Sequence, residues 1–441
     1  MDGSKRPGWL IVAVVAGFAA MAYIAWRPQP TAVAPAPQPI AAKPASTAPA
    51  QARPTAAKPA ATPLPQVVAP AVVLAPDPAV RSLASTSGPD DWAMEGSNPS
   101  RNRATAADLA LPLSQQRALA VAGDTGTGSP LTIARDTILV ESPHRLRAFD
   151  LHSGAEHWSL PLNGIYISPA VAGNIVFVRS EADNKGQLLA LDIRSGQQLW
   201  AFTPKRLSSQ DNAYFGGHLT SPVVVDGTVY VGAGKEVYAL DAGNGSVLWE
   251  FAAQDYISSS ATVADGHVYI SDFRYFYSID QRSGVLAWSY PTTMSIYFSP
   301  VAADQIVMLT DGDKLTALDP ASGKLRWTVQ FAGEKLIPGA VQGSRVFVKS
   351  TSTISALDLT NGKELWRFND RNFISLPAVA DNLVFVVSGS GADSAVVALD
   401  AASGRSSWRQ QVGSLATTAP VIAGKTIYVR TGDGRVLGFW H

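Results

Sequence analysis

The residues that could carry out nucleophilic, acid–base or metal chemistry are few and scattered along this chain. It has no cysteine and six histidines, which fall in separate parts of the sequence: His144, His152, His157, His218, His267 and His441. His152 and His157 could share a metal ion, but we favour solvated turn residues. The chain has no His-x-x-x-His or His-Glu-x-x-His pair, no Gly-x-Ser-x-Gly turn and no phosphate-binding loop. The sequence therefore predicts no catalytic, metal-binding or cofactor-binding residues.

Aromatic rings together with an arginine could instead recognise a partner. Such residues fall in loops between the regular apolar segments of the chain: Tyr166, Tyr214, Phe215, Tyr256, Tyr297, Phe298, Arg371 and Phe373. Exposed aromatics and arginine are typical of interface hot spots. The alternative is local packing, in which several rings fill the centre of the fold or cover its ends. We expect both roles among these residues, which form the candidate partner-binding face.

A repeat of about 40 residues must position these loops. The pattern Asp-x-x-x-Gly-x-x-x-Trp occurs seven times, and successive tryptophans lie 42, 49, 39, 39, 39 and 42 residues apart. A period of this length with several strand-like segments per unit is typical of a β-propeller blade. We expect the seven tryptophans to pack each blade against its neighbour: Trp158, Trp200, Trp249, Trp288, Trp327, Trp366 and Trp408.

One repeat, Ser221–Phe251, shows how a blade would form. It contains four short apolar segments separated by Gly, Asp and Asn, and none is long enough for a helix. Asp241 and Gly245 fall in the last turn, where the Asp side chain can bond the backbone and Gly can adopt a positive φ. Trp249 follows on the fourth segment, and replacing such a buried Trp by Ala would cost about 3–5 kcal/mol.

The number of first strands predicts eight blades, with seven as the alternative. The first strands begin near Pro130, Pro169, Pro222, Ala261, Pro300, Gly339, Ala378 and Pro420. The eighth unit, Ala419–Trp440, contains only three strands before the sequence ends. An open edge would invite pairing with another chain. We therefore expect the segment around Gln116–Ala122 to supply the missing fourth strand and close the ring.

The repeat resembles the blades of the pyrroloquinoline-quinone-type, or quinoprotein-like, β-propellers. Val237–Asp241 and Leu248-Trp249 are similar to the consensus of that family, and Asp91–Pro99 is similar to its lead-in segment. The resemblance covers about residues 91–441 and implies an all-β, eight-bladed propeller of four-stranded antiparallel blades. In plan the chain is similar to the propeller subunit of the outer-membrane β-barrel assembly machinery. That subunit is anchored through a lipidated cysteine, which this chain lacks.

Three segments precede the propeller. Residues 1–8 form a short tail that we expect to be cytoplasmic. The uncharged run Trp9–Trp26 would span about 27 Å as a helix, close to the hydrocarbon thickness of a membrane, and is interpreted as a signal anchor. The alternative is a signal peptide cleaved near Ala20–Ala22, which would leave a soluble periplasmic protein. Residues 27–90 are rich in Pro and Ala and are expected to form a disordered linker. We therefore expect the propeller in the periplasm of a Gram-negative bacterium, tethered to the inner membrane.

Three functional hypotheses follow. The balance of 35 basic and 35 acidic residues argues against nucleic-acid binding. The first hypothesis is a non-enzymatic protein-interaction scaffold without a cofactor, whose partners are envelope proteins such as outer-membrane barrel assembly, secretion or pilus components. The second is a quinoprotein dehydrogenase using the quinone and calcium, as the resemblance implies for some members. However, the adjacent cysteines of those enzymes are absent, and no calcium-ligand set matches. The third is a periplasmic sensor or carbohydrate-binding propeller.

Overall fold

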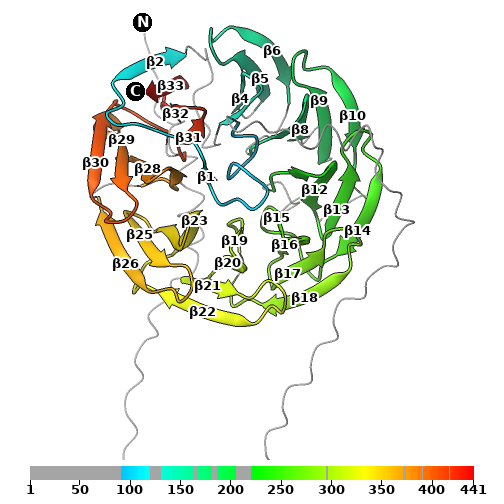
Figure 1. Cartoon of the computed structure of the whole chain (residues 1–441). Coiled ribbons are helices and arrows are strands. Elements are labelled where there is room, and N and C mark those ends of the chain that lie inside the picture. Colours follow the sequence, from blue (N-terminus) through cyan, green and yellow to red (C-terminus); the bar gives the residue numbers. More distant parts are fainter. Residues whose placement is uncertain are drawn as a thin grey trace, which may run out of the picture. The chain divides into compact units, whose positions relative to one another are not determined.

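The described residues form a ring of β-sheets. The computed structural model describes residues 91–119, 131–142, 144–162, 167–180, 186–204, 220–294, 296–370, 374–389, 391–416 and 418–441. Within them the fold is all-β, and eight four-stranded antiparallel blades surround a common centre (Figure 1). The predicted membrane helix and linker, residues 9–26 and 27–90, lie outside the described residues. In the described part of the chain, no helix is long and apolar enough to cross a membrane.

The strands of blades 1 to 7 follow one another from the centre to the rim. Blade 1 consists of β3 (Thr132–Ala134), β4 (Thr137–Ser142), β5 (Arg145–Asp150) and β6 (Glu156–Pro161), and blade 2 of β7 (Ala170–Ala172), β8 (Ile175–Ser180), β9 (Gln187–Asp192) and β10 (Gln198–Phe202). Blade 3 consists of β11 (Val223–Val225), β12 (Thr228–Ala233), β13 (Glu236–Asp241) and β14 (Val247–Ala252), and blade 4 of β15 (Thr262–Ala264), β16 (His267–Ser271), β17 (Tyr275–Asp280) and β18 (Leu286–Pro291).

The remaining blades have the same plan. Blade 5 consists of β19 (Val301–Ala303), β20 (Ile306–Asp311), β21 (Lys314–Leu318) and β22 (Leu325–Gln330), and blade 6 of β23 (Ile337–Gln342), β24 (Arg345–Lys349), β25 (Thr353–Asp358) and β26 (Glu364–Asn369). Blade 7 consists of β27 (Ala378–Ala380), β28 (Leu383–Ser388), β29 (Ala395–Asp400) and β30 (Ser406–Gln411), and blade 8 of β31 (Val421–Ala423), β32 (Thr426–Arg430), β33 (Val436–Trp440) and β2 (Gln115–Leu119). Blade 7 gains an inner parallel strand, β1 (Ala104–Thr105), and a 3-10 turn, η2 (Gly391–Asp393).

The middle strands form the core because each blade packs between two others. All six residues of β12 are buried, whereas β30 on the rim is exposed except at Trp408, which is half-buried. Strands covered on both faces are apolar at nearly every position, and rim strands keep polar residues on their outer face. This explains why the segments that become the second and third strands of blade 3, β12 and β13, are largely apolar.

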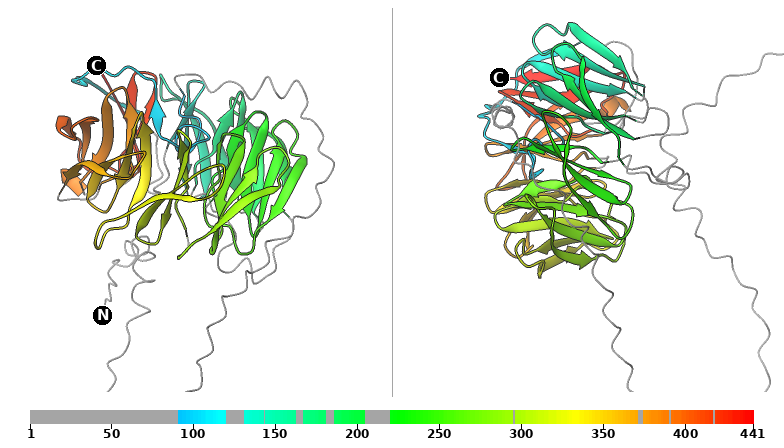
Figure 2. Two further views of the ribbon diagram at one scale, coloured as in Figure 1. Left: turned by 60° about the horizontal axis from the view of Figure 1, so that its bottom comes forward. Right: turned by 90° about the vertical axis from the view of Figure 1, so that its right-hand side faces the viewer.

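The eighth blade closes the ring with a strand from the start of the propeller. β2 pairs antiparallel with β33, with Gln115 opposite Trp440 and Leu119 opposite Val436. The prediction of eight blades and of a closing strand near Gln116–Ala122 is therefore confirmed, and seven blades is wrong. The strand begins one residue earlier than predicted, and residues 120–122 lie outside the described residues. Figure 2 shows β2 and the C-terminus together at one edge of the ring.

The repeated Asp, Gly and Trp form one contact between neighbouring blades. Asp241 Oδ1 accepts the N–H of Gly243 at 2.9 Å, which fixes the turn of blade 3. Gly245 in this turn has a φ of +74°, and a Cβ there would lie 2.6 Å from the Trp200 ring of blade 2. Trp200 Nε1 in turn donates to the carbonyl of Ala242 at 3.0 Å. The same bond joins Trp158 to Ile193, Trp249 to Gln281, Trp288 to Pro320, Trp327 to Leu359 and Trp366 to Ala401.

The closing blade uses different contacts on its two sides. It has no turn between its third and fourth strands, because β2 comes from elsewhere in the chain. Trp408 of blade 7 therefore contacts Phe439, with ring centroids 6.0 Å apart. On the other side, Leu119 lies against Gly154 of blade 1, where its Cδ2 is 3.2 Å from the position of an added Cβ. Leu119 thus takes the place that Trp occupies at the other turns.

Candidate functional site

The segment before the first blade runs through the centre of the ring (Figure 1). This central segment, Asp91–Thr105, accepts backbone hydrogen bonds of 2.8 to 3.1 Å from the first strands of six blades. The donors are Ile133, Val171, Val263, Ala302, Val341 and Val379, and the acceptors are Trp92, Ala93, Pro99, Ser100, Asn102 and Arg103, in that order. The order of these contacts follows the order of the blades. The segment is therefore bound to most of the ring and occupies part of its centre.

A tight turn folds the central segment back on itself. Gly96 has a φ of +80°, and a Cβ there would lie 2.7 Å from the Cα of Arg101. The N–H of Arg103 donates to the Gly96 carbonyl at 3.1 Å, and Asn98 Nδ2 donates to Asn102 Oδ1 at 2.7 Å. Only glycine allows the two limbs of the turn to approach this closely. The turn brings the side chain of residue 95 beside the guanidinium group of residue 101.

Glu95 and Arg101 form an ion pair at the centre, with Arg101 Nη1 2.9 Å from Glu95 Oε2. Arg101 Nε also donates to the Ala261 carbonyl at 2.7 Å, and Nη2 donates to the Ser221 carbonyl at 3.4 Å. Burial alone would raise the pKa of Glu95, but the charges of Arg101 and Arg103 and hydrogen bonds from serines lower it below its ordinary value. Glu95 is therefore held as a carboxylate, and the hydrogen-bonding capacity of Arg101 is used within the fold.

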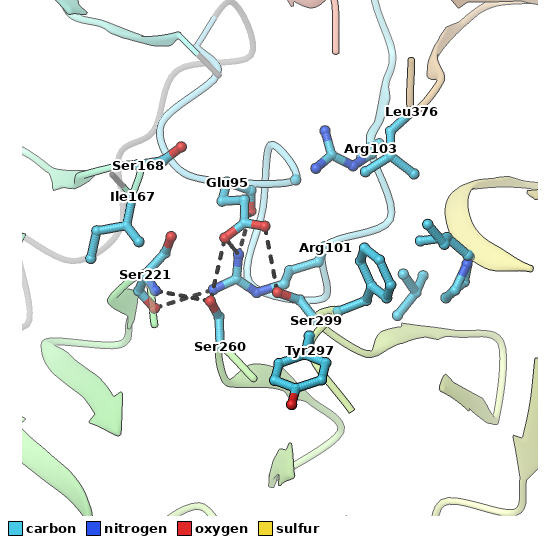
Figure 3. Close-up of a pocket in the computed structure, with 15 residues that line it drawn as sticks. Glu95, Arg101, Arg103, Ile167, Ser168, Ser221, Ser260, Tyr297, Ser299 and Leu376 are labelled. Carbon is cyan, nitrogen blue, oxygen red and sulfur yellow. Dashed lines mark hydrogen bonds and ion pairs between the residues drawn. The ribbon is translucent and has the colours of Figure 1, made fainter. Parts of the chain in front are cut away.

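Arg103 is placed differently from Arg101. It is 6% exposed, and its Nη1 is buried without a hydrogen-bond partner among the described residues. Ser168, just before β7, is 2% exposed, and its Oγ also lacks a partner within the described ranges. In Figure 3 the Arg103 guanidinium group points toward the middle of the view, and no dashed line reaches it or Ser168. Burial lowers the pKa of Arg103, and the negative charge of Glu95 opposes this shift. Arg103 remains charged, because a guanidinium group is not deprotonated in proteins.

These side chains line a cavity of about 170 Å³. Its walls come from residues just before or at the start of the first strands, so it opens on the face that carries the loops between blades, here called the interblade face. Ser260 and Ser299 each donate a hydrogen bond of 3.4 Å to the Glu95 carboxylate. Ile167, Leu376 and Phe298 supply apolar surface. The cavity therefore combines one ion pair, one further arginine, serine hydroxyls and apolar walls.

The structure describes three of the eight residues predicted to form the partner-binding face. Tyr297 and Phe298 line the cavity, and Tyr297 is 52% exposed. Lys335 Nζ lies 5.3 Å from the Phe298 ring centroid, and Lys235 Nζ lies 5.0 Å from that of Tyr256. Tyr256 is half-buried and does not line the cavity. The other five lie outside the described residues: Tyr166, Tyr214, Phe215, Arg371 and Phe373.

The histidine pair considered for metal binding is not brought together on one ligand set. His152 Nε2 lies 3.2 Å from Asp136 Oδ1, whereas His157 Nε2 lies 3.8 Å from Asp150 Oδ2. The two histidine side chains are 73% and 39% exposed. Within the described part of the chain, no group of three or more His, Asp and Glu side chains could hold a metal ion.

Sequence reasoning did not identify Glu95, Arg101, Arg103 and Ser168 as site residues. The lead-in Asp91–Pro99 was interpreted only as part of a family resemblance. A signal was present, because three charged residues lie within nine positions of a segment that precedes every repeat. They line one cavity with Ser168 and Ser260 only because the blades surround the central segment, and no local sequence pattern indicates that arrangement.

Comparison with known families and structures gives matches along most of the chain. The sequence matches the family described as "Outer membrane protein assembly factor BamB" at residues 76–213, 184–336, 292–372 and 350–440. No curated protein sequence matches the chain.

Solved structures share the fold at low identity. BamB from Moraxella catarrhalis is 16% identical, with a TM-score of 0.57 over 75% of this chain and 100% of that chain. The quinohemoprotein alcohol dehydrogenase from Comamonas testosteroni is 14% identical, with a TM-score of 0.63 over 82% of each chain. A europium-containing methanol dehydrogenase is 15% identical, with a TM-score of 0.58 over 78% of this chain and 89% of that chain. These likenesses concern the propeller architecture, which is common to proteins of different function.

Proposed function

The chain belongs to the family of the outer membrane protein assembly factor BamB, and on that premise we propose that it is a non-enzymatic protein-interaction scaffold of the bacterial envelope. Its partners in this proposal are outer-membrane barrel assembly, secretion or pilus components. The interblade face docks the partner, and the ring presents its loops as a rigid unit.

The observation that carries this proposal is the occupation of the ring's centre by the chain itself. The central segment bonds six blades, and the cavity that remains measures about 170 Å³. Pockets that hold drug-sized ligands and cofactors are larger, roughly 300–1,000 Å³. The centre of the described propeller is thus better suited to structural support than to enclosing a fused-ring quinone.

Exposed apolar side chains beside the cavity also favour partner docking. Met294 is 63% exposed and Tyr297 is 52% exposed, and both belong to the loop that joins blades 4 and 5. The centroid of the half-buried Phe273 ring lies 6.0 Å from that of Tyr297, so aromatic rings from two loops of this face lie side by side. Aromatic and Met side chains are enriched where protein partners bind.

We further propose that the propeller works in the periplasm, tethered to the inner membrane by Trp9–Trp26 and the linker of residues 27–90. The alternative is a soluble periplasmic protein released by signal cleavage. The absence of cysteine excludes attachment through a lipidated cysteine. Detection of the uncleaved chain in the membrane fraction of cells would support the tether, and its recovery in the periplasmic extract without residues 1–22 would contradict it.

Site-specific photo-cross-linking in cells tests the scaffold proposal. A photo-reactive amino acid at Tyr297 should trap an outer-membrane or secretion component. The matched control is Ala321, an exposed residue of the turn between β21 and β22, on the opposite face of blade 5 from the loop that holds Tyr297. Equal trapping from both positions, or none from a folded and exported chain, would contradict docking at the interblade face.

The quinoprotein dehydrogenase remains the alternative function. Dehydrogenases are among the structural neighbours, although at 14–15% identity they show only the fold. Dye reduction by the purified full chain with the quinone and calcium would support this alternative and contradict a non-enzymatic role. Without spectral change or dye reduction, the scaffold is the better account.

A further inference from the structure

Two hydrogen-bonding groups without partners line one cavity. Arg103 Nη1 and Ser168 Oγ are both buried, and neither has a hydrogen-bond partner among the described residues. Burying a polar group without a hydrogen-bond partner is unfavourable, so each such group in a native protein needs an explanation. The central segment supplies Arg103 and the first strand of blade 2 follows Ser168, so the two groups line one cavity only because the blades surround the central segment.

The charges of the lining do not cancel. Arg101 and Arg103 are the basic residues of the lining, and Glu95 is its acidic residue. Arg101 is engaged by Glu95 and by the carbonyl oxygens of residues 95, 221 and 261. Arg103 therefore leaves the cavity with one positive charge in excess. A buried charge is stabilised when an opposite charge completes its hydrogen bonds.

We infer that this cavity binds a carboxylate group, which pairs with the Arg103 guanidinium group and accepts a hydrogen bond from Ser168 Oγ. A guanidinium group matches a carboxylate through paired N–H donors, and the serine hydroxyl supplies a further donor. One excess positive charge balances one carboxylate, whereas Glu95 would repel the second charge of a phosphate dianion.

The apolar walls indicate that the carboxylate belongs to a ligand that also has an alkyl part. Ile167, Leu376 and Phe298 contribute to the lining, and Tyr297 stands at the exposed rim. These side chains can contact the alkyl part of a ligand while its carboxylate faces Arg103. The ligand is therefore a small organic acid or a carboxylate presented by a peptide. The inference goes beyond the scaffold role, because it concerns ligand chemistry and holds whichever protein docks on the interblade face.

Calorimetric titration of the purified full chain tests this inference, with butyrate as the small carboxylate and inorganic phosphate as the comparison anion. We expect butyrate to bind, and Arg103→Gln to weaken its binding about tenfold or more. Arg135→Gln is the matched control, since Arg135 also has a positive φ of 54° but is exposed and donates to Asn174 Oδ1. Butyrate binding lost only in Arg103→Gln supports the site.

The inference would be overturned if the unmodified chain, Arg103→Gln and Arg135→Gln bound butyrate equally, or if none of them bound it. Water would then be the occupant of the cavity. Phosphate binding as tight as that of butyrate would overturn the assignment to carboxylates. If Arg103→Gln does not fold, Ser168→Ala decides, because it removes only a hydroxyl. It should weaken butyrate binding about threefold or more, and an unchanged affinity counts against the site.

Peptides identify the source of the carboxylate. A hexapeptide ending in leucine is titrated with a free and with an amidated carboxyl terminus. Tighter binding of the free peptide than of butyrate, lost on amidation and in Arg103→Gln, supports a peptide carboxylate. Binding of butyrate but of neither peptide supports a small organic acid. Equal binding of the free and amidated peptides contradicts recognition of a peptide carboxyl terminus.

Discussion

Glu95 and Arg101 form an ion pair of 2.9 Å at the centre of the ring, although both residues precede the first blade in the sequence. The Arg101 side chain is 2% exposed and that of Glu95 is 23% exposed, so the pair is largely withdrawn from water. Removing one member of such a pair leaves the other charge buried without compensation. We therefore expect the stability of the propeller to depend on the central segment, although this segment precedes the repeats in the sequence.

Replacing Glu95 by Gln should lower the free energy of unfolding by about 3 kcal/mol, because the Arg101 charge stays buried. Urea unfolding of the full chain, followed by tryptophan fluorescence, measures this loss. Asp433→Asn is the control, since its ion pair with Arg435 has side chains 58% and 51% exposed and such a pair contributes about 0–1 kcal/mol. Similar losses in both variants would contradict a special role for the central pair.

The same carboxylate should make stability depend on acid pH. Burial would raise the pKa of Glu95, but Arg101, Arg103 and two serines lower it from its ordinary 4.5. A group whose pKa is lower in the folded state adds stability above its unfolded pKa, and this stability is lost as the pH falls through the folded pKa. The difference in unfolding free energy between the unmodified chain and Glu95→Gln should therefore shrink below a pH of 4.5. A difference that is constant from about pH 7 to about pH 3 would contradict this coupling.

Gly245→Ala tests the contact between blades 2 and 3. Alanine would incur about 1–2 kcal/mol from the positive φ, and about 1–3 kcal/mol more because its Cβ overlaps the Trp200 ring. Gly266→Ala separates the two costs, since Gly266 has a φ of +78° but nothing within 4 Å of an added Cβ. Thermal unfolding should show a larger loss for Gly245→Ala. Equal losses would show that only the backbone conformation matters.

The fold could be predicted from the sequence because its determinants recur at fixed spacing. Asp241, Gly245 and Trp249 belong to a frame that repeats seven times, and each member acts within one blade or on the next. Even so, the sequence indicated only half of the role of Gly245. Its positive φ follows from the turn, whereas its contact with Trp200 depends on how two blades meet.

The central cavity could not be predicted because its residues have no periodic pattern. Ser260 donates to Glu95 across 165 positions of sequence, and Ser299 does so across 204. These contacts exist only once the blades close on the central segment. The aromatic loops were easier to identify, and Tyr297 and Phe298 do lie at this cavity. The sequence did not indicate that the cavity beside them is lined by the charged residues Glu95, Arg101 and Arg103.

Leu119→Ala should weaken the closure of the ring. Leu119 is 3% exposed and lies between the closing blade and Gly154 of blade 1, so its loss would leave a cavity costing about 2–5 kcal/mol. Leu325→Ala on the rim strand β22 is the matched control, because Leu325 is 53% exposed and should change stability by about 0.5 kcal/mol or less. Urea midpoints measure both variants. A small effect of Leu119→Ala would show that the backbone pairing of β2 with β33 is sufficient for closure.

Tyr297→Ala should separate binding from folding. Because Tyr297 is 52% exposed, its loss should leave the melting temperature nearly unchanged while reducing recovery of the partner protein in pull-down experiments. Trp249→Ala provides the contrast, since Trp249 is 2% exposed, donates to Gln281 and should cost about 3–5 kcal/mol when truncated. Truncating an interface hot-spot residue to alanine weakens the affinity for the partner about tenfold or more. If Tyr297→Ala unfolds the chain as Trp249→Ala does, its ring supports the fold and does not belong to a docking surface. If it leaves both folding and partner recovery unchanged, the partner binds elsewhere on the ring.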